Sequence, residues 1–373
     1  MQSFTPSRLT LARRRRGLTK SELAAAAELT LRSVVHYESG TVVPPGDRVE
    51  QLAKVLRYPV AFFARPDVEL LDHSGVSFRS LARMKASQRD RALAAAEMAL
   101  ELIGWLEREA RFEFPNPDVP DLATLRDPEA AALALRSLWH LGDKPISNMI
   151  RLLESRGVRV FSLAEEHDAL DGYSFWRDGV PFVFLNTMKS AERSRFDAAH
   201  ELAHLVLHRH GHARSRDVEH EAHAFASAFL MARTSIVAHA PRVATMDNLI
   251  AAKRAWGVSL GAFAHRLHAV GRITAWQYRA LFVEMAKRKL RTIEPNPGPR
   301  EMSLVFEKVF AGLRDDGMTK AALAKQLGWP LSELNALVFG LVLSASASSA
   351  PTSSFDEDDQ RGEDGRLGGL ALI

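Results

Sequence analysis

The sequence predicts a mainly helical protein with a small β-sheet, which places it in the α+β class. Apolar residues recur every three or four positions through residues 6–65, as they do on the buried side of short helices. Two runs of apolar and aromatic residues flank Asp178-Gly179 between residues 172 and 186, which is the pattern of a β-hairpin. Helical periodicity returns near residue 190 and continues to about residue 340.

The N-terminal 66 residues are expected to form a bundle of five short helices. Thr19 and Thr30 are predicted N-caps, because a threonine hydroxyl there accepts a hydrogen bond from a backbone N–H of the first turn. Gly17 and Gly40 are predicted to end helices, since glycine adopts the left-handed conformation readily. The helices that follow Thr19 and Thr30 have the arrangement of a helix-turn-helix, whose second helix enters the major groove of DNA.

The positive charge of the chain is concentrated in this module. Residues 1–66 carry eleven Lys and Arg against five Asp and Glu, a net charge of +6, whereas the whole chain has +4. A basic front module is typical of nucleic-acid binding, although a solvated helical face would look similar. We expect base contacts from Thr30, Arg32, Ser33 and His36, and phosphate contacts from Lys20 and the run Arg13 to Arg16.

The rest of the chain is divided by composition and periodicity. A long helix is expected from Ser87 to about Arg111, and another helical segment near 128–155, before the strands begin. The tail is rich in Ser, Gly and acidic residues and is expected to be disordered. The predicted segments are a DNA-binding domain at 1–66, a helical linker at 67–140, a domain with the sheet at 141–240, a helical C-terminal region at 241–340 and the tail at 341–373.

Residues 199–208 read AHELAHLVLH, which is an H-E-x-x-H pattern on a predicted helix. His200 and His204 lie one turn apart on the same helix face, so that both imidazoles can reach one Zn²⁺. Glu201 projects about 100° away from His200, near enough to act as a general base without being a ligand. A buried helix with three ordinary histidines is the alternative interpretation.

A zinc centre of this kind needs a third protein ligand, and the absence of cysteine restricts the choice to histidine or carboxylate. Glu219 lies on the apolar stripe of the following helix, where an unpaired carboxylate would be costly, and is the predicted ligand. Glu221 lies one step off that stripe and is the reserve. His210 has a suitable spacing, but Leu207 stands where a helix-breaking glycine would be needed. His208 is the best candidate for a residue that orients a metal ligand by hydrogen bonding without itself binding the metal.

Two segments resemble known families. The pattern from "RL..AR" through "GLT..ELA" and "YE.G" resembles the Cro/C1-type (Xre) repressor domains, which implies a DNA-binding bundle. The sequence departs from that family at three positions: Lys20 replaces a glutamine, Glu28 replaces the turn glycine and Val35 replaces a polar residue.

The run VPFVFLNTMKSAERSRFDAAHELAHLVLH, followed by EHEAHAFASAFLMA, resembles the ImmA/IrrE family of zinc metallopeptidases. The resemblance implies a zincin-like domain in which His200, His204 and Glu219 bind zinc and Glu201 is the catalytic base. His223 stands where that family usually has Asn or Asp.

The leading hypothesis is therefore a DNA-binding regulator with a zinc endopeptidase domain that cleaves a repressor-type protein or the chain itself. The alternative is a repressor or antitoxin whose peptidase-like domain senses a metal, a small ligand or a partner protein and cuts nothing. The expected partners are a double-stranded DNA operator, a protein substrate, repressor or toxin, and a second copy of the chain. No signal peptide or membrane span is recognisable, so we expect a cytoplasmic protein. An extended substrate is expected to pair with the strand at 180–186.

Overall fold

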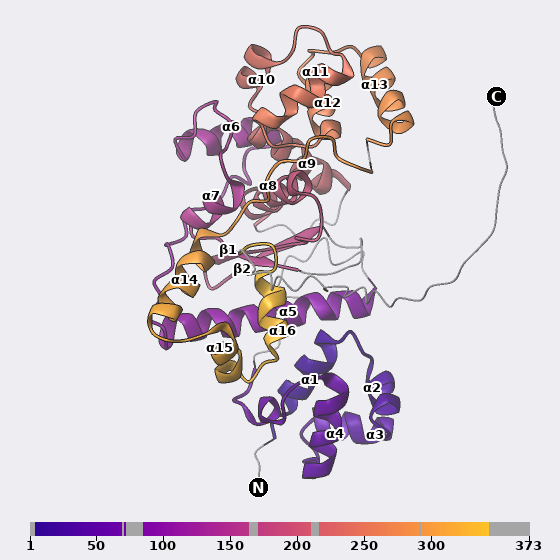
Figure 1. The fold of residues 1–373 in the computed structure, drawn as a ribbon, viewed down its shortest axis with the longest axis vertical. Coiled ribbons are helices and arrows are strands. Elements are labelled where there is room, and N and C mark those ends of the chain that lie inside the picture. Colours follow the sequence, from indigo (N-terminus) through magenta and orange to yellow (C-terminus); the bar gives the residue numbers. More distant parts are fainter. Residues whose placement is uncertain are drawn as a thin grey trace, which may run out of the picture. The chain divides into compact units, whose positions relative to one another are not determined.

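The computed structural model describes residues 4–68, 71, 85–163, 171–209, 216–290 and 292–342, and shows a mainly helical chain with one three-stranded sheet (Figure 1). The predicted α+β class is thereby confirmed. The described residues, which end at Val342, belong to one compact unit. The predicted disordered tail lies outside the described residues, apart from its first two positions. Among the described helices, none combines the length and the hydropathy needed to cross a bilayer.

The N-terminal module contains four α-helices and a short 3-10 helix. Thr19 and Thr30 cap the second and third helices through bonds from the backbone N–H groups of Glu22 and Ser33, as predicted. Gly17 and Gly40 both have positive φ at helix ends, which confirms their expected role. The elements are α1 (Pro6–Arg15), α2 (Lys20–Ala26), α3 (Leu31–Glu38), α4 (Gly46–Leu56) and η1 (Val60–Ala64).

The long helix expected from Ser87 to about Arg111 is α5 (Ala86–Arg108). The helical segment expected near 128–155 is two helices, α6 (Pro128–Leu138) and α7 (Met149–Ser155). Each starts at a side-chain cap, Asp127 for α6 and Asn148 for α7, which explains the break between them.

The sheet consists of β1 (Arg159–Ser162), β2 (Gly172–Arg177) and β3 (Val180–Leu185) in the order β1-β3-β2. The predicted hairpin is confirmed: β2 and β3 pair antiparallel around Asp178 and Gly179, both with positive φ. β1 pairs parallel to β3 on its other side. The expectation that the strand at 180–186 offers a free edge is therefore wrong, because β3 is central and pairs on both sides.

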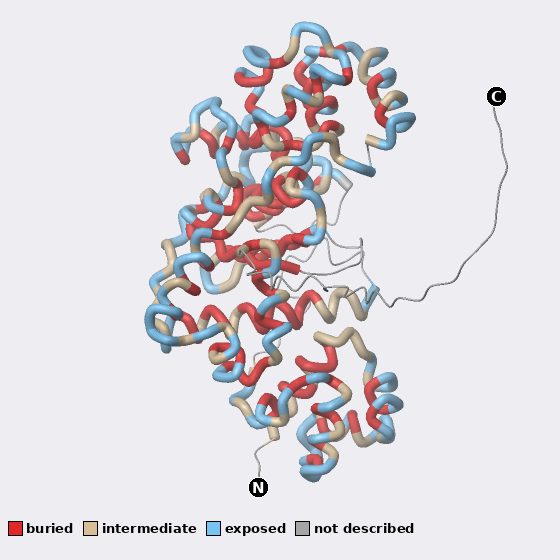
Figure 2. The backbone as a smooth tube through the Cα atoms, viewed as in Figure 1, coloured by how far each residue is buried: buried red, intermediate tan, exposed pale blue. Residues whose placement is uncertain are grey.

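Helices cover the two faces of the sheet. The hydroxyl of Tyr173 on β2 donates to the backbone carbonyl of Ala92 on α5 at 2.7 Å, whereas Ser174 contacts Glu201 on α8 (Ala191–Leu207). Successive side chains of a strand alternate between faces, so β2 lies between α5 and α8. Figure 2 shows the strands and α8 buried along most of their length.

The remaining helices follow α8 in the chain. α9 packs against both α8 and α6. These elements are α9 (Arg216–Leu230), α10 (Arg233–His239), α11 (Met246–Ala252), η3 (Lys253–Ala255), α12 (Leu260–Ala269), α13 (Ala275–Lys287), α14 (Leu304–Asp315), α15 (Lys320–Leu327) and α16 (Leu331–Val338).

Charged side chains of α1 hold the N-terminal module against α5 and α16. Arg14 pairs with Glu97 on α5 at 2.8 Å, and both side chains are buried. Arg15 and Arg16 share the buried carboxylate of Glu333 on α16, at 2.8 and 2.5 Å. Because these charges are removed from water, each depends on its partner for stabilisation.

The turn between α2 and α3 has a strained residue. Glu28 has φ of 48°, in the left-handed region that disfavours residues with a Cβ. We expect Glu28→Gly to raise the free energy of unfolding by about 0.5–1 kcal/mol, measured by urea denaturation. The matched control is Glu50→Gly within α4, an exposed helical position, which should lower it by about 1 kcal/mol. Destabilisation by both changes would contradict the assigned strain.

Burial of Glu97 gives a second prediction. Burial raises the pKa of Glu97 to about 7, although Arg14 opposes the shift. Between pH 4.5 and about 7 the folded chain therefore holds more protons at this site than the unfolded chain, so its contribution to stability falls as the pH rises. Glu97→Gln should remove a slope of at most about 1.4 kcal/mol per pH unit from denaturation curves, and the exposed control Glu50→Gln should not. An unchanged slope would assign the titration to another group.

Candidate metal centre and DNA-contacting surface

Two histidines on α8 point their ring nitrogens at the same place. Ser190 caps the N-terminus of α8. His200 and His204 lie one turn apart near the C-terminal end of the helix. Their Nε2 atoms are 3.1 Å apart, and both side chains are nearly buried. Two neutral imidazoles at this separation offer two nitrogen lone pairs to one cation.

Glu219 on α9 completes a group of three potential ligands. Its carboxylate oxygens lie 3.6 Å from His200 Nε2 and 3.9 Å from His204 Nε2, and the three ligand atoms lie within 4.8 Å of one another. Ligands about 2.0–2.1 Å from a tetrahedral zinc ion are about 3.3 Å apart. The separations of 3.1, 3.6 and 3.9 Å, the last two to different oxygens of Glu219, are near that value, so the three residues present fit the ligand set of a zinc ion.

The structure also places the two other candidates for the third ligand. Glu221 lies outside the group of three, and its Oε2 is 2.9 Å from His208 Nε2. His210 lies outside the described residues. In the sequence, Leu207 stands where a helix-breaking glycine would be needed, which counted against His210. α8 nevertheless ends at Leu207. Among the described residues, Glu219 is therefore the carboxylate that faces both histidines.

Glu201 is held between α8 and the sheet. Its side chain is buried, and its Oε2 accepts a hydrogen bond from Ser174 Oγ at 2.7 Å. Burial raises the pKa of Glu201 to about 7, which His200 and Ser174 oppose. Gly172 on β2 makes room for this packing, since a Cβ there would lie 3.4 Å from Glu201 Cγ and 2.8 Å from the carbonyl oxygen of Phe184.

Sequence reasoning missed Ser174 and Gly172. A signal for Ser174 exists, because it is the one polar residue within the apolar run from 172 to 176, but the pattern does not reveal which helix it faces. The contact depends on the packing of α8 on β2, which is a tertiary feature.

The surroundings of the histidines are rich in carboxylates. Burial disfavours the charged form of His200, yet Glu219, Glu201 and Asp197 together raise its pKa. His223, whose ring lies 4.7 Å from that of His200, has its pKa lowered to about 4 by burial and by His200, which keeps it neutral. The site therefore favours a positive charge at the position between the ligands.

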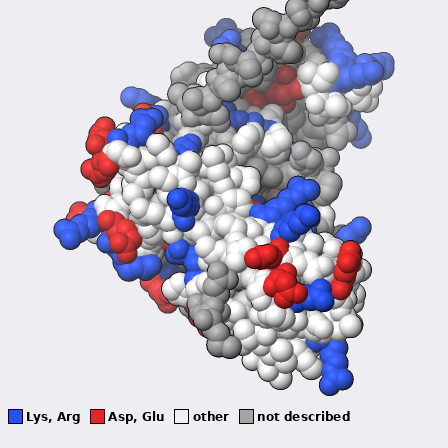
Figure 3. Space-filling view, turned by 60° about the horizontal axis from the view of Figure 1, so that its bottom comes forward, with Lys and Arg blue, Asp and Glu red and all other residues white. Residues whose placement is uncertain are grey.

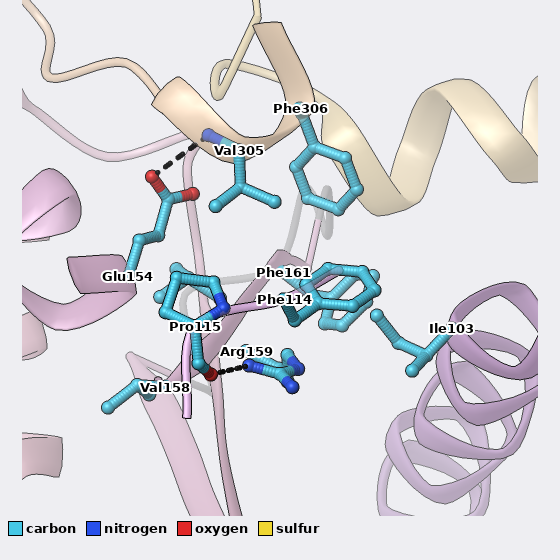
Figure 4. Close-up of a pocket in the computed structure, with 10 residues that line it drawn as sticks. Ile103, Phe114, Pro115, Glu154, Val158, Arg159, Phe161, Val305 and Phe306 are labelled. Carbon is cyan, nitrogen blue, oxygen red and sulfur yellow. Dashed lines mark hydrogen bonds between the residues drawn. The ribbon is translucent and has the colours of Figure 1, made fainter. Parts of the chain in front are cut away.

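Two hollows of the described surface lie away from this centre. One, between β1, α5 and α14, has a cavity volume of about 10 Å³, room for about one water molecule, and Glu154 at its wall is bonded to backbone N–H groups of α14 (Figure 4). The other is an open groove of about 690 Å³ beside α7, whose lining includes Lys144, Arg151 and Arg300. Neither is lined by the predicted site residues.

The predicted base-contacting residues extend from the N-cap of α3 to its last turn. Thr30 caps the helix and bonds the Ser33 hydroxyl at 2.8 Å, Arg32 is exposed, and His36 follows one turn after Arg32. The Nζ atom of Lys20 lies 3.3 Å from Oε2 of Glu38. Among the described residues on the face seen in Figure 3, basic and acidic side chains are interspersed.

The structure corrects the expectation for the run Arg13 to Arg16. Arg13 is buried, and its guanidinium binds the Glu38 carboxylate and the carbonyl oxygen of Leu18. The next three arginines pair with Glu97 and Glu333, as described above. A guanidinium with these partners is not available to phosphates, so we leave Arg13 out of the proposed DNA contacts.

These features define the class of the protein: a helix-turn-helix module joined to a peptidase-like domain with an H-E-x-x-H helix. Residues 9–63 match the helix-turn-helix family model, and residues 153–268 match the IrrE N-terminal-like domain of the M78 peptidases. The chain thus joins an Xre-type helix-turn-helix to an ImmA/IrrE-type domain.

A search of the curated proteins gives no match. Among solved structures, the crystal structure of ComR from S. thermophilus in complex with DNA and its signalling peptide ComS is similar over 84% of this chain and 99% of that chain, at 13% identity. Its TM-score of 0.17 is too low to establish a shared fold.

The ligand geometry gives a direct prediction. Purified protein is expected to bind about one zinc ion per chain, and His200→Ala or Glu219→Ala should weaken binding by more than about 100-fold, measured by competition with a chromophoric chelator. His220→Ala, an exposed histidine on the same helix as Glu219, is the control and should bind as the wild type does. Equal affinity in all four proteins would exclude this group as the zinc site.

Proposed function

We propose that the protein is a transcription regulator that binds DNA through its helix-turn-helix and cleaves a protein through a zinc endopeptidase centre. The observation that carries the proposal is the convergence of His200, His204 and Glu219 next to the buried Glu201. The substrate is a repressor-type protein or the chain itself, and cleavage relieves repression.

Each residue of the centre has a distinct role in this proposal. His200, His204 and Glu219 hold the ion, which when bound supplies a positive charge that polarises the scissile carbonyl. Glu201 accepts a proton from the attacking water and passes it to the leaving amine. Ser174 keeps the Glu201 side chain in place through its 2.7 Å bond. Burial, which raises the pKa of Glu201, matches this carboxylate to proton transfer near neutral pH.

For DNA, we propose that Thr30, Arg32, Ser33 and His36 read bases from the major groove and that Lys20 contacts a phosphate. A repressor of this type reads two half-sites with two copies, so we propose a homodimer on a two-fold operator. The proposed domain boundaries remain 1–66, 67–140, 141–240 and 241–340, although the family match of the second domain extends to residue 268.

A second function is favoured by the docking of the DNA-binding module onto the rest of the chain. Arg14 is bonded to α5, and Arg15 and Arg16 are bonded to α16. A ligand, metal or partner protein that shifts those helices would move the DNA-binding module without any cleavage. The peptidase-like domain would then be a sensor.

The two functions are separated by Glu201→Gln. The change preserves shape and leaves an oxygen that can accept the bond from Ser174, so zinc and operator binding should be kept. Loss of the general base should lower cleavage of a co-expressed repressor-type substrate, and of the chain itself, by about 10²- to 10⁴-fold, measured by gel and mass spectrometry. If the Glu201→Gln protein still regulates a reporter gene fully, the proposed endopeptidase function is wrong and the sensor function remains.

A further inference from the structure

We propose that His208 and Glu221 are positioning residues that fix the ring of His204 and direct its Nε2 toward the metal. This inference rests on the proposed zinc centre and deepens it. Glu221, the reserve candidate for the third ligand, thereby has a role in the centre without being a ligand.

The three side chains form a continuous chain of contacts. His204 Nδ1 lies 3.1 Å from His208 Nδ1, and His208 Nε2 lies 2.9 Å from Glu221 Oε2. His208 is buried, at 8% exposure, whereas the Glu221 side chain is 43% exposed. The chain starts at a predicted ligand, passes through an interior ring and ends on a carboxylate near the surface.

The positions of the protons follow from the chemistry of the groups. A neutral imidazole has one N–H and one acceptor nitrogen. If Nε2 of His204 keeps its lone pair for the metal, its proton is on Nδ1 and is donated to His208 Nδ1. His208 then carries its proton on Nε2 and donates it to Glu221, which as a carboxylate only accepts. Every contact has one donor and one acceptor, so the carboxylate selects the tautomer of both rings.

The same chain also ties two helices together. His208 caps the C-terminal end of α8, and Glu221 belongs to α9, the helix that supplies Glu219. Their hydrogen bond is therefore a second connection between the two helices whose separation sets the ligand distances. Among the described residues, no group makes a hydrogen bond to the buried Nδ1 of His200, so the support that we propose is directed at His204.

The test is the zinc affinity of the full chain, measured by chelator competition for the wild type, His208→Ala, Glu221→Ala, the double variant and the control His220→Ala. We expect a loss of about 10- to 100-fold for His208→Ala and a loss in the same direction for Glu221→Ala. Because the residues act in series, the double variant should bind no more weakly than His208→Ala. The control should bind as the wild type does.

A spectroscopic measurement separates positioning from a merely structural role. Long-range ¹H–¹⁵N spectra of the zinc-loaded wild type should show His208 protonated on Nε2, and Glu221→Ala should lose that single tautomer. Because Glu221 is partly exposed, its variant should fold even if His208→Ala does not, which circular dichroism checks.

The outcomes distinguish this inference from the function on which it rests. A wild type that binds no zinc overturns both. A wild type that binds zinc, with unchanged affinity in Glu221→Ala and His208→Ala or with His208 protonated on Nδ1, overturns the positioning role and leaves the zinc centre. Additive losses in the double variant overturn the serial chain.

Discussion

The interaction on which the peptidase-like domain depends is the approach of the Glu219 carboxylate to two imidazoles across the contact between α8 and α9. A partly buried carboxylate among apolar helices requires a positive partner. The carboxylates around His200 raise the pKa of that ring, so they favour positive charge at this place. The divalent cation that we propose would supply that charge and would contact Glu219 and both imidazoles at once.

Local features of this molecule could be predicted from the sequence because their causes are local. The caps at Thr19 and Thr30 depend on a hydroxyl and a neighbouring N–H, and the hairpin depends on the conformations open to Asp178 and Gly179. The i, i+4 spacing of His200 and His204 places both side chains on one face of any α-helix. The sequence also shows that Glu28 stands where the turn usually has glycine. The structure gives Glu28 the positive φ that glycine would adopt there.

Features that depend on long-range packing could not be predicted in this way. The order of the strands depends on β1 pairing with β3, which is distant in the sequence. The central position of β3 therefore has no local signal. The run Arg13 to Arg16 has the composition of a phosphate-binding patch, yet its carboxylate partners include Glu333, more than 300 positions away. Composition gives the charge of a segment, but only the fold determines which groups neutralise it.

The alternation of side chains along β2 connects the candidate centre to the DNA-binding module. Ser174 faces α8 and holds Glu201, while the adjacent Tyr173 faces the other way and bonds the backbone of α5. α5 in turn binds Arg14 of α1 through Glu97. Each contact in this series is a buried hydrogen bond or ion pair, whose loss is costly. A displacement of β2 would therefore have to be accommodated by both α8 and α5, which makes the strand the element most directly placed to link the state of the centre to the module that reads DNA.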